Sequence, residues 1–354
     1  MLFITLVSLS LSSPPTATVA DGVLSGLWEG STAAFLGVPY AKAPTGELRW
    51  SSPQKAEPWA TPKDATKFGG ECSQYYPMFT HGALIGSEDC LFLNVYAPGA
   101  ARPKPGADPA RRGAPLLPVM LWIHGGGYEG GAGSWYNASE LVDQLGGAAI
   151  AVTINYRLSV FGFLGGDDLR ARSADNSTGN YGLQDQRLAM QWVQDNAAAF
   201  GGDASRVTIF GESAGAGSVS CHLCAQKSRG LFARAGMQSS SFTTGAATLH
   251  ADAQNIWGTI LKKARCSDAQ CMASKTTAEL MTAKAAMPAC CDFLYPFLPW
   301  APVVDGVELR QHPFHCVANT ARVEQAALAG SPVPLAERDA TDTVATVPIL
   351  LYIT

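Results

Sequence analysis

The fold of this chain is decided by the segment Val207-Thr208-Ile209-Phe210-Gly211-Glu212-Ser213-Ala214-Gly215-Ala216-Gly217. Its β-branched run, Gly-x-Ser-x-Gly turn and small-residue run predict a strand, a sharp turn and a helix. A serine at the apex of such a turn has a strained backbone and an exposed hydroxyl, while Gly211 and Gly215 let the strand and the helix pass closely. Ser213 is therefore the candidate nucleophile; the alternative is a flexible turn built from the same common residues.

The sequence around this turn predicts an α/β fold with a mostly parallel sheet. Residues 180–200 carry apolar side chains at helical spacing and end at Gly201, and residues 214–223 are small enough for close packing on a sheet. Short apolar runs separated by turn residues in segment 35–50 predict an antiparallel entry to the sheet. Further strands are predicted over residues 91–96, 119–123 and 148–154. Strands that alternate with helices are typical of a parallel sheet with crossover helices.

A second glycine-rich segment, His124-Gly125-Gly126-Gly127-Tyr128, follows one of the predicted strands. Three consecutive glycines let backbone N–H groups point together at an oxyanion, or they merely make a flexible turn. Because the segment follows a buried strand and precedes the serine turn, it favours an oxyanion-binding loop.

The composition is that of a globular protein, with 47% apolar and 15% charged residues among 354. This length allows one large α/β unit or two domains. The formal charge of −4 and the scattered basic residues give no support to nucleic-acid binding. No stretch after the N-terminal segment reaches the ~18 apolar residues of a spanning helix, so we predict no membrane span. The Pro-, Ala- and Arg-rich segment 99–115 is expected to be an exposed loop.

Residues 1–20 are predicted to be a secretory signal peptide. An apolar run over residues 2–11 is followed by Thr18-Val19-Ala20, which resembles a small-x-small cleavage site, whereas the alternative is a buried strand. Nine cysteines and the sequons at Asn137 and Asn176 agree with an oxidising, secreted environment. We therefore expect a secreted glycoprotein whose domain spans residues 21–354.

Two cysteine pairs carry separate expectations. Cys72 and Cys90 bracket an aromatic loop, and we expect a disulfide between them rather than two buried thiols. Cys221 and Cys224 have the spacing of a metal or redox pair, but on a helix behind the serine turn we predict that both are packed thiols. We expect no metal ion and no cofactor.

Together these motifs resemble the type-B carboxylesterases, the cholinesterase-like branch of the α/β-hydrolases. The matching segments follow the family order and span most of residues 22–225, with a sparser match at 302–306. They are 35–50, 88–95, 124–128, 155–164, 179–202 and 211–215. The resemblance implies an α/β-hydrolase fold, with a central mostly parallel sheet, antiparallel N-terminal strands and crossover helices.

The resemblance also implies a role for each residue of the site. Ser213 attacks an ester carbonyl, while the N–H groups of Gly126, Gly127 and Ala214 hold the oxyanion, each preorganised donor contributing ~3 kcal/mol. Glu212 lines the site in the family; its alternative role is to hold the loop in place.

Two disulfides follow from the resemblance, Cys72–Cys90 and Cys266–Cys271. It gives no partner for five further cysteines, namely Cys221, Cys224, Cys290, Cys291 and Cys316.

The resemblance supplies no acid and no base within this sequence. A serine hydroxyl needs a histidine to take its proton and an acid to orient that histidine. In the family the acid follows the strand that residues 347–354 resemble, where the sequence ends. The domain is therefore predicted to be incomplete at its C terminus, either as a fragment of an active enzyme or as a shortened product.

No histidine of the sequence matches the family's base. His222 lies ~13 Å from Ser213 along a helix, His124 is expected to fix the glycine loop, and His81 belongs to the disulfide loop. Three histidines precede the expected acid and match no base or metal motif: His250, His312 and His315.

For the substrate, we expect a small carboxylic ester rather than acetylcholine. In the family a Trp of the first disulfide loop binds the quaternary ammonium group by cation–π attraction, and the loop between Cys72 and Cys90 offers only Tyr75, Tyr76 and Phe79. The rival function is a catalytically silent recognition or adhesion module, although such relatives typically lack the serine. A lipase acting at interfaces is a third interpretation.

Overall fold

The structure is a computed structural model that describes residues 13–75, 80, 82–99, 115–242, 246–287, 299–317 and 348–352. Several predictions from the sequence fall outside these residues. They concern the signal segment before residue 13, loop residues 100–114, Tyr76, Phe79, His81, Cys290 and Cys291.

Strands and helices alternate along most of the chain. The strands are β1 (Thr16–Val19), β2 (Gly22–Ser25), β3 (Leu27–Glu29), β4 (Thr32–Pro39), β5 (Lys63–Asp64), β6 (Phe92–Pro98), β7 (Leu117–Ile123), β8 (Ile150–Ile154), β9 (Gly202–Glu212), β10 (Arg234–Gln238), β11 (Thr248–Leu249), β12 (Val303–Val304) and β13 (Ile349–Tyr352). The helices are α2 (Ser139–Gln144), α3 (Ser159–Gly162), α4 (Asp167–Arg172), α5 (Tyr181–Asn196), α6 (Ala214–Cys224), α7 (His250–Ala264), α8 (Ala269–Ser274) and α9 (Thr277–Ala285).

The core of the molecule is an eight-stranded sheet in the order β13-β10-β9-β7-β8-β6-β4-β3. The five strands from β13 to β8 run parallel, whereas β3, β4 and β6 pair antiparallel with their neighbours. This arrangement confirms the predicted mostly parallel sheet and its antiparallel N-terminal entry. All five residues of β8 are buried, as expected for a strand covered on both faces.

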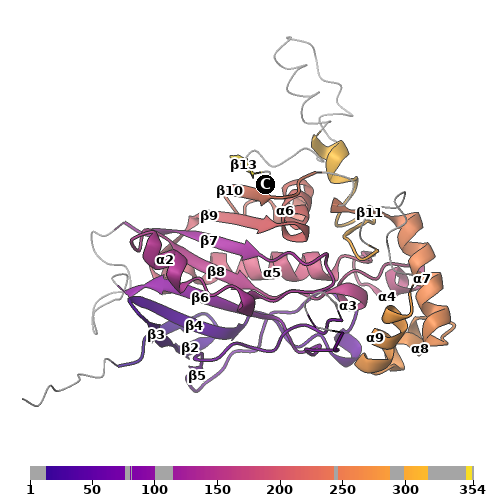
Figure 1. The fold of residues 1–354 in the computed structure, drawn as a ribbon, viewed down its shortest axis with the longest axis horizontal. Coiled ribbons are helices and arrows are strands. Elements are labelled where there is room, and N and C mark those ends of the chain that lie inside the picture. The colour runs from indigo at the N-terminus through magenta and orange to yellow at the C-terminus, as the bar shows by residue number, and fades with distance from the viewer. Residues whose placement is uncertain are drawn as a thin grey trace, which may run out of the picture.

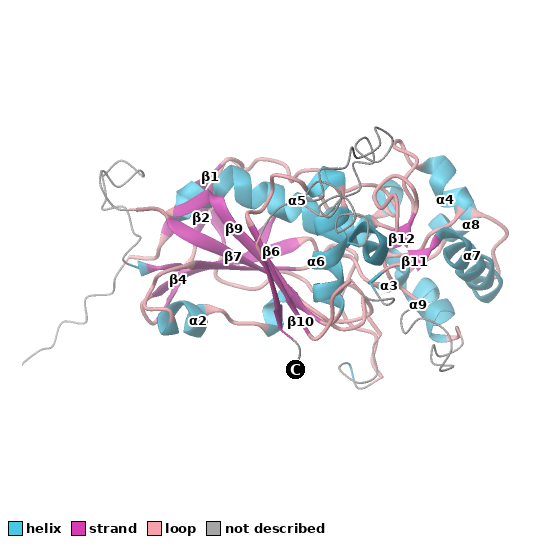
Figure 2. Ribbon diagram, turned by 90° about the horizontal axis from the view of Figure 1, so that it is seen from above, coloured by secondary structure: helices cyan, strands magenta, loops and turns pink. Residues whose placement is uncertain are grey.

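Helices lie on both faces of the sheet, with α5 and α2 on opposite sides, and α7, α8 and α9 gather beyond one end of the strands (Figures 1 and 2). The predicted helix over residues 180–200 is α5 followed by a 3₁₀ turn at Ala197–Phe200. Gly201 ends it with a positive φ of 83°, a conformation that glycine adopts without steric cost.

The N-terminal residues of the described chain are part of the fold. Strand β1 pairs antiparallel with β2, its Ala17 and Val19 are buried, and the N–H of Ala20 donates to Asn196 Oδ1 at 2.7 Å. Cleavage after Ala20 would therefore remove a strand of the small sheet β1-β2-β5.

Buried ion pairs tie distant segments together. Arg157 binds Asp185 of α5 through two side-chain nitrogens at 2.8 and 2.7 Å, and both residues are almost fully buried. Arg49 binds both carboxylate oxygens of Glu88 and also donates to the backbone oxygen of Lys275 just before α9. Removal of one partner from a buried pair leaves an uncompensated charge and typically costs about 3–5 kcal/mol.

Three disulfides join six of the seven described cysteines, and one of the three corrects a prediction. Cys72–Cys90 and Cys266–Cys271 are the two bridges that the family resemblance implied. The prediction of packed thiols holds for Cys221, which is free and buried, but is wrong for Cys224, which is bonded to Cys316. The two cysteines of this third bridge are 92 residues apart in sequence, and only the folded chain brings the end of α6 to residue 316.

Among the described residues, no helix combines the length and the apolar character that crossing a membrane requires.

Candidate active site

Ser213 stands between β9 and α6 in a strained backbone conformation. It is the N-cap of α6, with φ 53° and ψ −120°, values that a non-glycine residue adopts only where the surrounding structure imposes them. Its N–H donates to the backbone oxygen of Gln238 on β10 at 2.9 Å, and its carbonyl accepts from Gly217. The strand, sharp turn and helix predicted from the sequence are thus present around Ser213.

The two glycines that flank Ser213 meet backbone at very short distance. A Cβ placed on Gly211 would lie 2.6 Å from the carbonyl oxygen of Ile123, and one on Gly215 would lie 2.1 Å from the same oxygen. No side chain fits in either place, so the first turn of α6 rests directly on the end of β7.

The glycine-rich segment leaves β7 beside this turn. A Cβ on Gly125 would lie 3.2 Å from Ser213 Cβ and 2.9 Å from Glu212 Oε2, so the segment and the serine turn are in contact. Gly126 and Gly127 have φ values of 105° and 62°, and within the described part of the chain no hydrogen bond uses their N–H groups. Ala214 begins α6, where the first N–H groups of a helix have no intrahelical partner.

Glu212 is partly buried next to Ser213, and burial raises the pKa of its carboxyl group. Tyr136 lies near this carboxylate: the pKa of the Tyr136 phenol is raised by burial and then by the charge of Glu212. The Tyr136 ring also packs on Trp122 of β7 at 5.1 Å between centroids. Tyr136 was not among the residues singled out from the sequence, because its neighbours come from β7 and β9 and share no local pattern with it.

The described histidines all have other partners, and no hydrogen bond in the described chain reaches the hydroxyl of Ser213. His124 lies within hydrogen-bonding distance of the Gly125 carbonyl, stacks on Tyr156 and is fully buried, which lowers its pKa to about 4. His222 is held between Gln186 and Ser228, and burial lowers its pKa to about 3. His250 contacts Asp167 and Arg170, while His312 and His315 pack ring against ring.

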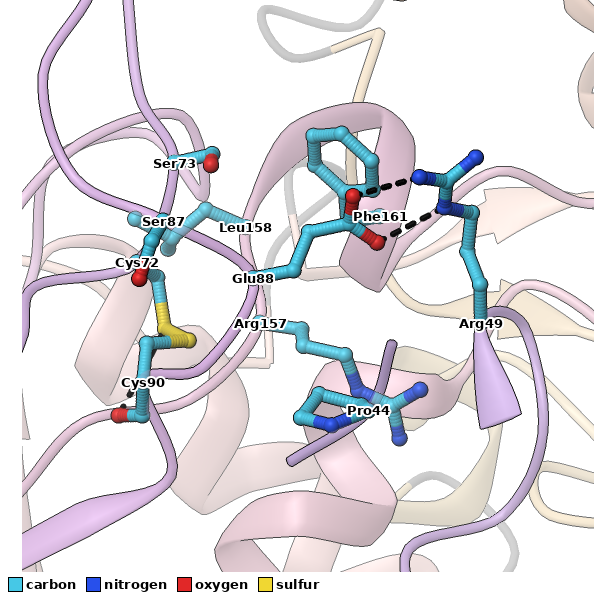
Figure 3. A pocket seen from close by; sticks show the side chains of 10 residues that line it. All are labelled: Pro44, Arg49, Cys72, Ser73, Ser87, Glu88, Cys90, Arg157, Leu158 and Phe161. Atoms are coloured by element: carbon cyan, nitrogen blue, oxygen red, sulfur yellow. Dashed lines mark hydrogen bonds and ion pairs between the residues drawn. A yellow bond between two sulfur atoms is a disulfide. The ribbon is translucent and has the colours of Figure 1, made fainter. Parts of the chain in front are cut away.

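Two cavities lie away from Ser213. One of about 10 Å³, with room for roughly one water molecule, is lined by Arg49, Glu88 and the Cys72–Cys90 bridge (Figure 3). There the Arg49 guanidinium donates two hydrogen bonds to the Glu88 carboxylate. A second cavity of about 280 Å³ is lined by Lys227, Glu308 and Arg310. Neither has Ser213 among its described lining residues.

A model of the carboxylesterase family matches residues 13–333. This chain belongs to the carboxylesterase family. The match confirms the family resemblance drawn from the sequence.

Curated relatives are similar in sequence to this chain over most of its length. It is 38% identical to carboxylesterase 1D of Mus musculus over 337 residues, which are 87% of this chain and 56% of the relative. It is 34% identical to Lipase 5 of Diutina rugosa over 341 residues, 87% of this chain and 60% of the relative. Among solved structures, the Geobacillus stearothermophilus carboxylesterase EST55 superimposes with a TM-score of 0.74 at 34% identity, covering 96% of this chain and 61% of that chain. The α/β-hydrolase fold is thereby confirmed, and the chain spans roughly three fifths of the length of these relatives.

The close contact at Gly215 predicts a large effect of a single methyl group. We expect Gly215→Ala to lower the free energy of unfolding by about 1–3 kcal/mol, because the new Cβ overlaps the Ile123 carbonyl and the backbone must shift. The matched control is Gly258→Ala in α7, where a Cβ meets no atom within 4 Å and helix propensity raises stability by about 1 kcal/mol. Chemical denaturation measures both values; equal effects of the two substitutions would contradict the assignment of close packing.

The two buried histidines predict a loss of stability in acid. Their pKa values in the folded chain, about 4 for His124 and about 3 for His222, lie below the ordinary value near 6.5, so the unfolded chain binds protons first. Stability is full above about pH 6.5 and falls as the pH is lowered toward 4, by roughly 1.4 kcal/mol per pH unit for each histidine. Denaturation curves at pH 7, 6 and 5 test this, and His222→Gln should have a shallower pH dependence than the wild type. An unchanged slope in that variant would rule out the histidine as the cause.

Proposed function

We propose that this protein hydrolyses carboxylic esters, with Ser213 as the nucleophile and an acyl-enzyme as the intermediate. The observation that carries the proposal is the backbone of Ser213, held at φ 53° between two glycines that admit no side chain. A strained serine at a strand-to-helix turn is the arrangement that exposes a hydroxyl at the C-terminal end of a strand in a parallel sheet.

In the proposed reaction, Ser213 Oγ attacks the ester carbonyl and loses its proton to a base. The negative charge on the carbonyl oxygen is stabilised by the N–H groups of Gly126, Gly127 and Ala214. This role is supported by Gly125, which contacts the serine turn and directly precedes the two glycines, and by the place of Ala214 at the start of α6. The alcohol leaves with a proton, and water then hydrolyses the acyl-enzyme. Glu212 lines the site with a carboxyl group whose pKa is raised by burial.

No base is assigned among the described residues, because none of their histidines is hydrogen-bonded to Ser213. The relatives named above are longer than this chain, and the activity is proposed for the whole protein.

For the substrate, we propose a small carboxylic ester. Relatives of this chain include proteins named as a carboxylesterase, a lipase, a juvenile hormone esterase and a cocaine esterase. These names share ester chemistry and differ in acyl and alcohol groups, which supports the reaction class and leaves the substrate open.

A secreted location is proposed from the three disulfides and the two sequons. Both acceptor asparagines are exposed, and Asn137 Nδ2 also donates to Glu29.

A fluorophosphonate probe tests the nucleophile directly. We expect covalent labelling of the naturally produced protein at Ser213, located by mass spectrometry, because an activated serine in an oxyanion site reacts with phosphonyl groups. The control is Ser213→Ala, which should lose all labelling.

Steady-state assays of the naturally produced protein test the proposed substrate class. Hydrolysis of p-nitrophenyl esters should exceed that of acetylthiocholine.

Absence of labelling in the natural protein would favour the rival function, a catalytically silent recognition module. Faster hydrolysis of acetylthiocholine than of p-nitrophenyl esters would overturn the proposed substrate class and leave the nucleophile standing.

The mature protein tests the proposed location. We expect it in the culture medium with a shortened N terminus and with glycans on Asn137 and Asn176, which peptide mass spectrometry before and after deglycosylation detects. An N terminus at Asp21 would confirm the predicted cleavage site and would mean a fold without β1. Intracellular retention of an unglycosylated chain would contradict the proposal.

A further inference from the structure

A buried lysine joins three segments that are far apart in sequence. Lys284, in the last turn of α9, is almost fully buried, and its Nζ donates to Glu129 Oε2 at 2.5 Å and to the backbone oxygen of Tyr75 at 3.0 Å. The same Nζ lies 5.8 Å from the centre of the Tyr75 ring. A buried ammonium group is stable only when it is paired and hydrogen-bonded, and here its charge partner is Glu129.

Glu129 belongs to the turn that contains the proposed oxyanion donors. The N–H groups of Glu129 and Gly130 both donate to the carbonyl of Gly126 at 3.0 Å. The turn contains three consecutive residues with positive φ: Gly126 at 105°, Gly127 at 62° and Tyr128 at 59°. The two glycines adopt a positive φ at no steric cost, whereas Tyr128 keeps its positive φ only where the surrounding structure holds it. Within this turn, Glu129 provides the charged side chain that anchors the backbone, through its ion pair with Lys284.

The far side of the turn is held by a neutral contact. Gln74, which is fully buried in the Cys72–Cys90 loop, accepts from the N–H of Gly131 at 2.8 Å and donates to its carbonyl at 3.2 Å. The disulfide loop therefore meets the turn twice, at Gly131 through Gln74 and at Glu129 through Tyr75 and Lys284.

The helix that carries Lys284 is fixed at its other end. Thr276 and Glu279 form a capping box at the start of α9, and Thr277 Oγ1 donates to Glu88 Oε1 at 2.6 Å. Glu88 is itself paired with Arg49 (Figure 3). A helix anchored at its N terminus places the ammonium of Lys284 in a defined position beside Glu129.

We propose that the Glu129–Lys284 ion pair positions the Gly126–Gly127 turn so that its N–H groups face the oxyanion formed at Ser213. The proposal rests on the ester-hydrolase function proposed above. Glu129 and Lys284 are positioning residues: neither touches the substrate, and each acts through the backbone of the turn. Loss of the pair frees the turn, which lowers kcat and leaves KM nearly unchanged, because oxyanion contacts are made in the transition state.

Hydrogen exchange in the full chain tests this without any need for turnover. In Lys284→Met, and in the double variant Glu129→Gln with Lys284→Met, we expect amide exchange within peptide 124–131 to accelerate about tenfold relative to wild type. The double variant leaves no unpaired charge, so its melting temperature should stay closer to the wild type than that of Lys284→Met. The control is Lys275→Met, which removes a partly exposed pair with Glu279 at 3.5 Å and should leave peptide 124–131 unchanged.

Selective acceleration in peptide 124–131 with both variants supports the proposal, and a fall in kcat with constant KM supports it further. Unchanged exchange in this peptide, or equal acceleration in all peptides, overturns it, because the pair would then contribute to global stability alone. If wild-type Ser213 resists fluorophosphonate while the exchange response is selective, the proposed function fails and the anchoring of the turn stands.

Discussion

The structure depends on one backbone contact, that between the first turn of α6 and the end of β7. Gly215 lies so close to the Ile123 carbonyl that an added Cβ would be 2.1 Å from the oxygen. This contact brings the start of α6 against the sheet, and the turn that joins β9 to α6 beside it holds Ser213 at a positive φ. It also places the start of the glycine segment against the serine, because that segment continues directly from Ile123. A steric constraint between two strands and a helix thus creates the site.

Ion pairs form a second level of organisation around this contact. Apolar side chains of the sheet and of α7, α8 and α9 belong to one core, and buried charges add further links between the α7–α9 end and the N-terminal part. Arg49 and Glu88 bind the start of α9, and Lys284 binds Glu129 at its end. Because loss of one partner leaves an uncompensated buried charge, each pair favours the arrangement in which these segments meet.

Features with a local cause were predictable from the sequence. The 3.6-residue period of α5, the apolar runs of β7 and β8, and the glycine stop at Gly201 each depend on neighbouring residues, and all occur where predicted. The glycine spacing around Ser213 predicted its strained turn for the same reason. The third disulfide was missed, since nothing near Cys224 indicates that residue 316 will lie beside it. Tyr136 and Lys284 were missed likewise, because their partners belong to distant elements.

The sequence by itself determined the family, the strand-turn-helix around Ser213 and the glycine segment. Each depends on residues that are contiguous in sequence, and the spacing of their glycines is required by close backbone contacts. Only the tertiary structure decided which segments meet: that Gly125 touches Ser213, that His124 and His222 are buried with other partners, and that Lys284 reaches Glu129. The physical reason is that such contacts arise from chain crossings over many residues, where burial and the pairing of charges select one partner among many that the sequence alone leaves equivalent.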